Sequence, residues 1–430
     1  MLRKVIYTIT GLLVIILLGF VLYPTKTNEA TPITQLPTEI QKLAPDSITK
    51  KTLAAEIDPN PYVQLLLAEY QKYIDKAILT GQAPGAAVVI VKDSTIIFLK
   101  GFGLKETGTT DSVDVNSVFR LGSVSKCFAS VLTGTLVNEE VIDWDDKVTR
   151  YVPNFKLKLK ANTDSLKIRH VLSHTIGLPY HAFTNMVEER VPLDSLLSRL
   201  KELNLVGLPG KVYSYQNVGY SLIEKVIESA TGKSYEEALT EKLFKPLHMQ
   251  NASASYARIT ENGNVAQPHF RSKRGWKATA ISDTYYNVAP AGGVNASIAD
   301  MGLWLQALLS TSGEVLSKET MDEMLTPQIK AVAKNRNFRM WKRPKASYYA
   351  MGWRILTFKN DTLDYHGGYV NGYRSEVALD RKNRMAISFL TNTPGKLADQ
   401  SIPQFFAMRS RYMELIDTWE KQNTTLLAKK

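Results

Sequence analysis

The sequence predicts an α+β fold in which helices flank one antiparallel β-sheet and an all-helical subdomain is inserted into the chain. Strand-like runs come early, helix-like segments occupy roughly residues 140–290, and strand-like runs return late, so both chain ends should build the sheet. The 430 residues are 44% hydrophobic and 22% charged, which is typical of a globular chain and excludes disordered and fibrous architectures. The single cysteine, Cys127, excludes an intramolecular disulfide bond and a cysteine-rich zinc site.

Residue periodicity predicts the individual elements. Apolar residues at helical spacing from Val63 to Ile78 predict a helix that begins near Pro61. Two apolar runs at 86–91 and 95–99, joined by a short polar turn, predict a β-hairpin. Further helices are expected at 124–138, 168–173, 193–203, 218–230, 235–243, 297–309 and 403–419, and further strands at 118–121, 348–357, 362–366, 374–379 and 385–390.

An apolar run near the N-terminus predicts export. It spans residues 5–23 behind Arg3 and Lys4, and about 19 residues at a rise of roughly 1.5 Å each just cross a hydrocarbon core. The basic flank should stay in the cytoplasm. The residues that follow directly offer no small-residue cleavage site before Ala30. We therefore expect residues 1–24 to be a transmembrane anchor, with the rest facing the periplasm or cell envelope; a cleaved signal and a secreted protein is the alternative.

The rest of the chain divides into a linker and one domain. Residues 25–60 are rich in Thr, Pro, Lys and Glu and are expected to be a tether, whereas 61–425 should form the globular domain, with its helical part at about 140–290. The formal charge of +12 has its densest cluster at 271–277 and a second one at 334–345. We interpret both clusters as solvated loops, and export makes nucleic acid an unexpected partner.

One short motif carries the chemistry of a nucleophile. Ser123-Val124-Ser125-Lys126 places a serine and a lysine one helical turn apart, on the same face. A buried lysine can lose its proton and help to deprotonate the neighbouring hydroxyl, and a helix N-terminus favours a developing oxyanion. Gly122 allows the tight turn that exposes the serine. Ser125 is a weaker candidate because no lysine follows three residues later.

A second triplet, Tyr215-Gln216-Asn217, opens a predicted helix. A tyrosine near a lysine can act as a general base when its pKa is depressed, and an asparagine amide can hold a substrate amide. The alternative is structural: an aromatic residue in a tyrosine-rich loop, followed by a helix-capping asparagine.

A third segment, His366-Gly367-Gly368, follows a predicted strand. Two glycines let a ligand approach the backbone closely. A backbone N–H here could pair with that of Ser123 as an oxyanion hole.

The order S-x-x-K, Y-x-N, H-x-G resembles the serine β-lactamase and penicillin-binding-protein family, in particular its class C β-lactamase-like branch. The segments 168–179 and 290–293 are also similar to that family, and the resemblance covers roughly 62–392. It implies a site between an antiparallel sheet and an all-helical part.

The resemblance also implies a role for each motif residue. Ser123 would be the acylated nucleophile, Lys126 and Tyr215 the proton-transfer pair, and Asn217 the group that positions the substrate amide. The N–H of Tyr369 would complete the oxyanion hole. The implied reaction is acyl transfer through an acyl-enzyme, with no metal and no organic cofactor.

The third motif departs from the family's usual Lys-Thr-Gly. A histidine is mostly neutral at pH 7, so recognition of a substrate carboxylate would depend on Arg374. Histidine at this position resembles the family's esterases and D-amino-acid peptidases. We therefore expect a serine hydrolase acting on a small-molecule or peptide substrate, such as a D-amino-acid peptide of the cell envelope. The alternatives are a true β-lactamase and a non-catalytic protein that binds peptidoglycan or a protein partner.

Overall fold

The computed structural model describes residues 53–423, except for 311–314, 332–340, 342–343 and 360. The expected anchor at 1–24, most of the expected linker at 25–60 and most of the second basic cluster therefore lie outside the described residues. Within the described ranges, every helix is too short or too polar to cross a membrane.

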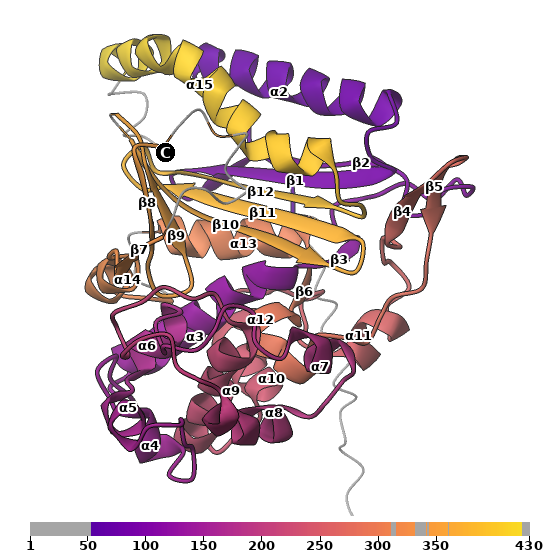
Figure 1. Ribbon diagram of the computed structural model, residues 1–430. Coiled ribbons are helices and arrows are strands. Elements are labelled where there is room, and N and C mark those ends of the chain that lie inside the picture. Colours follow the sequence, from indigo (N-terminus) through magenta and orange to yellow (C-terminus); the bar gives the residue numbers. More distant parts are fainter. Residues whose placement is uncertain (1–52, 311–314, 332–340, 342–343, 360, 424–430) are drawn as a thin grey trace, which may run out of the picture. The chain divides into compact units, whose positions relative to one another are not determined.

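An eight-stranded antiparallel sheet forms the centre of the domain (Figure 1). Its first hairpin pairs with the last strand, with Ala86 opposite Thr391, so both chain ends build one sheet, as predicted. In spatial order, the strands are β2 (Thr95–Gly103), β1 (Gly85–Lys92), β12 (Met385–Thr391), β11 (Tyr373–Asp380), β10 (Thr362–Val370), β9 (Arg354–Thr357), β8 (Ala346–Tyr349) and β7 (Ile329–Lys330).

Helices cover both faces of this sheet. Helices α2 (Pro61–Leu79) and α15 (Lys396–Gln422) lie together on one face, and α13 (Ile298–Leu309) packs on the other (Figure 1). The alternation of side chains along β1 explains this layering, because Val88 packs with the α2 and α15 core and Val89 with the core on the α13 side. The predicted α+β class with an antiparallel, helix-flanked sheet is confirmed.

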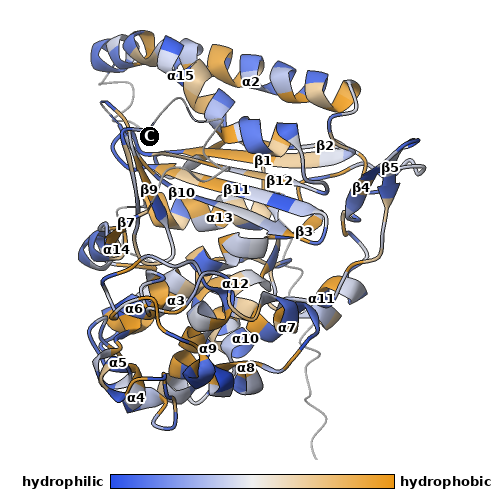
Figure 2. Ribbon diagram, viewed as in Figure 1, coloured by the Kyte–Doolittle hydropathy of each residue, from blue (hydrophilic) through white to orange (hydrophobic). Residues whose placement is uncertain are grey.

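The helical part lies below the sheet in Figure 1, and Figure 2 shows that its helices contain both apolar and polar residues. Its central helix, α3 (Ser125–Asn138), is buried over nearly its whole length. Around it lie α4 (Val148–Tyr151), α5 (Lys160–Ser165), α6 (Ile168–Leu172), α7 (Thr184–Glu188), α8 (Leu193–Arg199), α9 (Asn217–Thr231), α10 (Tyr235–Leu239), α11 (Tyr256–Glu261), α12 (Ala289–Gly292) and α14 (Lys318–Met324).

Two small sheets complete the domain. Strand β3 (Val118–Arg120) pairs with β6 (Asn295–Ser297) beside the start of α3. Strands β4 (His269–Ser272) and β5 (Gly275–Ala278) form a separate hairpin over the first basic cluster, which we had interpreted as a solvated loop.

Two predicted elements differ from the structure. The expected strand at 348–357 is split into β8 and β9 by a turn at Gly352, which has φ +77° and lies so close to α3 that an added Cβ would be 2.6 Å from the Cβ of Ser130. The last helix begins at Lys396 and contains Pro403, where the sequence had suggested its start. It begins earlier because Leu397 is buried against the sheet, a long-range contact that local proline statistics do not include.

Candidate active site

Ser123 lies on a tight turn between β3 and α3. The turn is a 3₁₀ segment, Gly122–Val124, in which Gly122 has φ +50°. Strand β10 passes directly against it: a Cβ added to Gly122 would lie 2.8 Å from the backbone of Tyr369, and one added to Gly368 would lie 2.0 Å from the carbonyl oxygen of Leu121. Glycine at both positions therefore brings the backbone of β10 to the serine.

Lys126 is fully buried one turn after the serine. Its Nζ lies 3.3 Å from the Ser123 Oγ, 2.9 Å from the Asn217 Oδ1 and 2.8 Å from the carbonyl oxygen of Ala291. Burial lowers the pKa of Lys126 well below its usual value, and the nearby Arg354 lowers it further. As a neutral amine, Lys126 can donate to Asn217 and Ala291 and accept the serine proton.

Tyr215 contacts the same oxygen from another side. Its hydroxyl donates to the Ser123 Oγ at 2.9 Å, and its ring lies 4.8 Å from the Lys126 Nζ. Burial raises the pKa of Tyr215 above its ordinary value, contrary to the depressed pKa that a tyrosine base requires. In this contact Tyr215 is the donor, and the lowered pKa of Lys126 makes the lysine the better candidate base.

These residues meet at a polar cavity of about 330 Å³. Three of its lining residues, Ser123, Tyr215 and Asn217, belong to the first two motifs. The complete lining is Ser123, Tyr180, His181, Tyr215, Asn217, Tyr285, Ala291, Gly292, Arg354, Gly367, Tyr369 and Arg374. The cavity therefore brings together residues from all three motifs and from both the sheet and the helical part.

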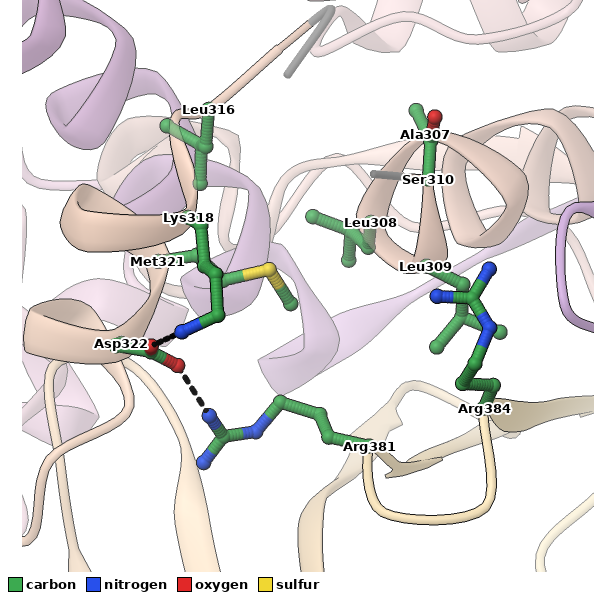
Figure 3. A pocket seen from close by; sticks show the side chains of 10 residues that line it. All are labelled: Ala307, Leu308, Leu309, Ser310, Leu316, Lys318, Met321, Asp322, Arg381 and Arg384. Atoms are coloured by element: carbon green, nitrogen blue, oxygen red, sulfur yellow. Dashed lines mark hydrogen bonds and ion pairs between the residues drawn. The ribbon is translucent and has the colours of Figure 1, made fainter. Parts of the chain in front are cut away.

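Another hollow, of about 210 Å³, lies between α13, α14 and the turn that follows β11 (Figure 3). Its walls include Leu308 and Leu309, and at its rim Asp322 pairs with Lys318 and Arg381. It contains none of the expected site residues, so we assign the chemistry to the cavity at Ser123.

The comparison with protein families agrees with this geometry. The family model "Beta-lactamase" matches residues 64–404, which include all three motifs. The chain belongs to the Beta-lactamase family. This confirms the resemblance to serine β-lactamases and penicillin-binding proteins that the motifs indicated.

Individual relatives of this Beta-lactamase-family chain are distant. "Protein flp" of Staphylococcus aureus is 24% identical over 331 residues, which cover 74% of this chain and 61% of flp. "Unguisins hydrolase ungD'" of Aspergillus campestris is 23% identical over 349 residues, covering 76% of this chain and 61% of that protein. The chain therefore spans about three fifths of the length of these curated relatives.

A solved structure supports the fold. The octameric penicillin-binding protein homologue from Pyrococcus abyssi superposes with a TM-score of 0.68 at 23% identity, covering 81% of this chain and 77% of that one. At this identity the match shows the fold alone, a β-lactamase and transpeptidase-like arrangement of sheet and helices.

The third motif is placed differently from the first two. Gly367 and Tyr369 line the cavity, whereas His366 is not among its lining residues and has 1% of its surface exposed. The His366 Nε2 is 3.0 Å from the Tyr349 hydroxyl. Burial, with Arg354 nearby, lowers the pKa of His366 well below its usual value, so the imidazole is neutral at pH 7. His366 is thus a buried, neutral group that contacts Tyr349 and offers no charge to a substrate.

Arg374, the expected substitute for the family lysine, also lines the cavity. Its guanidinium pairs with Glu376 and, at 2.9 Å, with Asp399. Its charge is thus already shared between two carboxylates.

Four residues of the cavity lining were not predicted from the sequence: Tyr180, His181, Tyr285 and Arg354. Of these, Arg354 carries the charge. It begins β9, is 7% exposed, and donates to the Tyr213 hydroxyl at 3.3 Å while facing the rings of Tyr215 and Tyr349. Burial alone would lower its pKa, but the surrounding tyrosines raise it above the ordinary value, so the cation persists. The sequence signal that could have indicated Arg354 is its position as a charged residue within the apolar run predicted as a strand at 348–357.

Proposed function

We propose that this chain is a serine hydrolase that cleaves an amide or ester through an acyl-enzyme on Ser123. The observation that carries the proposal is the position of the Ser123 Oγ, which has the Lys126 Nζ at 3.3 Å and the Tyr215 hydroxyl at 2.9 Å. A nucleophile, a base and an acid are therefore all within reach of one reacting atom.

The reaction follows from these contacts. Neutral Lys126 takes the proton of Ser123 while the Oγ attacks the substrate carbonyl. The backbone N–H groups of Ser123 and Tyr369 stabilise the oxyanion, since β10 lies against the nucleophile turn. Tyr215 donates its proton to the departing amine or alcohol, and the ammonium of Lys126 resupplies it. Water then attacks the acyl-enzyme, with the same groups moving the proton in reverse.

The charge at the cavity supports a substrate that carries a carboxylate. Arg354 holds a buried cation beside Tyr215, and Arg374 adds a second, partly neutralised one. A carboxylate entering this cavity would form a charge-assisted contact with the Arg354 guanidinium in a poorly solvated place. A D-amino-acid peptide or a related cell-envelope compound has the required amide or ester and a carboxylate next to it.

A true β-lactamase is the second candidate, and a non-catalytic binder of peptidoglycan or protein is the third. The favourable geometry of Ser123, Lys126 and Tyr215 speaks against the binder. A β-lactamase and a peptidase differ in how long an acyl group derived from a β-lactam stays on the serine. Rapid loss of this acyl group supports the β-lactamase, and a long-lived acyl-enzyme supports the peptidase.

Intact-protein mass spectrometry distinguishes these candidates. The protein is exposed to a fluorophosphonate, to a panel of β-lactams and to D-Ala-D-Ala esters, with Ser123→Ala as the test and Ser125→Ala as the matched control. We expect adducts on Ser123 that persist in Ser125→Ala and vanish in Ser123→Ala. A wild-type protein that none of the reagents labels would exclude the hydrolase.

The proposal includes a location outside the cytoplasm. The apolar run at 5–23 behind two basic residues supports export. Mass spectrometry of the mature N-terminus after expression, together with cell fractionation, separates an anchored from a cleaved form.

A further inference from the structure

The basic cluster that the active site does not use lies on the β4–β5 hairpin. Between residues 262 and 282 the chain has four Lys or Arg residues and no Asp or Glu. The two strands form a sheet of their own and extend away from the main sheet beside the end of β2 (Figure 1). Figure 2 shows the hairpin as a mostly hydrophilic projection.

The hairpin is fixed along one face and at its base. The Trp276 Nε1 donates to the carbonyl oxygen of Gly81 at 2.9 Å, and the Arg271 Nη1 donates to the same oxygen at 3.1 Å. The N–H of His269 donates to the carbonyl of Asn392 at 2.8 Å. A two-stranded hairpin is marginally stable alone, so these contacts are what present its outer part in a defined position.

Its cations are distinguished by their density. Some exposed lysines elsewhere pair with a carboxylate, as Lys160 does with Asp164. Others, such as Lys156 and Lys201, form no ion pair in the part of the chain that the structure describes, but the hairpin gathers its cations with no acidic residue among them. The four hairpin cations are exposed and form no ion pair with any residue in the described ranges: Arg271, Lys273, Arg274 and Lys277. Four like charges on one hairpin repel each other unless an external anion neutralises them.

An exposed aromatic residue accompanies these charges. Phe270 pairs with Lys277 across the hairpin, so both lie on one face, and 47% of the Phe270 surface is exposed. Arg271 and Trp276 form the other face, which is turned towards Gly81, while Lys273 and Arg274 are at the tip. The free face thus combines an apolar ring with cations at and near the tip.

We propose that the β4–β5 hairpin is a docking surface for an anionic lipid bilayer. Phosphate headgroups complement the cations at the tip, and Phe270 inserts at the boundary of headgroups and acyl chains, where aromatic rings are favoured. The aromatic ring favours a bilayer over a soluble anionic polymer, which would use the charges alone. Because the hairpin contributes no residue to the cavity, docking is independent of the proposed hydrolysis.

Hydrogen–deuterium exchange of the full chain tests this proposal. The protein is placed in nanodiscs of phosphatidylcholine alone or mixed with phosphatidylglycerol, so that any N-terminal insertion is the same in both. We expect slower exchange over 270–277 only in the mixed discs, and about fivefold less docked protein for each cation neutralised. Lys273→Gln with Arg274→Gln should abolish the protection, and Phe270→Ser should reduce it.

The control variant removes the same net charge from another part of the surface. Lys156→Gln with Lys201→Gln removes two exposed cations from the helical part and should leave the protection intact. Equal protection in both kinds of disc, or equal protection by soluble heparin, would overturn the proposal. Fluorophosphonate labelling of Ser123 should be unchanged in every variant, which separates a failure of docking from a failure of the hydrolase.

Discussion

The guanidinium of Arg120 donates to the carbonyl oxygen of Thr284 at 2.7 Å. A second donation, also at 2.7 Å, goes to the carbonyl oxygen of Ser282, and the group lies 4.3 Å from the centre of the Tyr286 ring. Arg120 is fully buried three residues before the nucleophile, so it ties the 282–284 loop to β3, the strand that precedes the turn with Ser123. The next residue of that loop, Tyr285, has φ +70° and lines the cavity.

We predict that Arg120→Lys weakens substrate binding and spares the nucleophile. Lysine keeps the charge, but its ammonium lacks the planar arrangement of N–H groups with which the guanidinium donates to both carbonyl oxygens. Tyr285 therefore loses its fixed position. KM for a peptide or ester substrate should rise about tenfold, with fluorophosphonate labelling of Ser123 unchanged. Tyr285→Ala should have a similar effect, and adding Arg120→Lys to it should change little; additive effects would contradict this coupling.

Lys126→Arg should abolish most acylation. Arginine cannot become neutral, so it cannot accept the serine proton, and the acylation rate should fall about 10²–10⁴-fold. In the wild type, burial lowers the pKa of Lys126, so acylation should rise with pH and level off below the pH at which an exposed lysine titrates. Stopped-flow measurement of the acylation rate across a range of pH tests both the loss in Lys126→Arg and the pH dependence of the wild type. A rate independent of pH in the wild type would remove Lys126 from the role of base.

Tyr215→Phe should affect amides more than esters. The lost hydroxyl is the proton donor to the leaving group, and an amine needs protonation more than an alcohol does. We expect acylation by an amide to fall about 10²-fold and acylation by an activated ester to fall clearly less. Matched amide and ester substrates with the same acyl group provide the measurement. Equal losses on both would indicate that Tyr215 only orients Ser123.

The buried histidines predict sensitivity to acid. Burial lowers the pKa of His366 and of His174 in the folded protein, so the unfolded chain binds more protons once the pH falls below about 6.5. The contribution of each histidine to stability is then full above this pH and declines as the pH falls, by up to roughly 1.4 kcal/mol per pH unit. Burial raises the pKa of Asp364 to about 6 and that of Glu376 to about 7, so these carboxyls act in the opposite direction in the same range, and the share of His366 is measured as a difference between two proteins. Urea unfolding at pH 7 and pH 5 should show that His366→Gln loses less stability on acidification than the wild type, and an equal change in both proteins would exclude His366 as a cause.

Gly368→Ala should inactivate the site through one methyl group. Its Cβ would lie 2.0 Å from the carbonyl oxygen of Leu121 and 3.0 Å from the Ser123 nitrogen, so β10 must move away from the nucleophile. We expect a loss of at least about 10²-fold in acylation, the usual scale for a displaced oxyanion donor. Gly263→Ala is the control, since an added Cβ there has no neighbour within 4 Å. A fully active Gly368→Ala protein would argue against this oxyanion hole.

Local patterns in the sequence determined much of this protein. The spacing of Ser123 and Lys126 places them one helical turn apart in any α-helix, and two apolar runs joined by a short polar turn predict the hairpin at the start of the sheet. Gly122 indicated a tight turn before the helix, and Gly367 and Gly368 indicated a close approach to the backbone. These features depend on residues that are neighbours along the chain or one turn apart.

Only the tertiary structure decided how the groups are charged and what they face. The pKa of Tyr215 is raised rather than depressed because the phenol is buried, and His366 is buried beside Tyr349 of β8 instead of lining the cavity. Arg354 reaches the cavity from a strand that the sequence merged with its neighbour. Burial and charge pairing arise between segments far apart in the chain, so no local pattern records them, and the chemistry of the site depends on both.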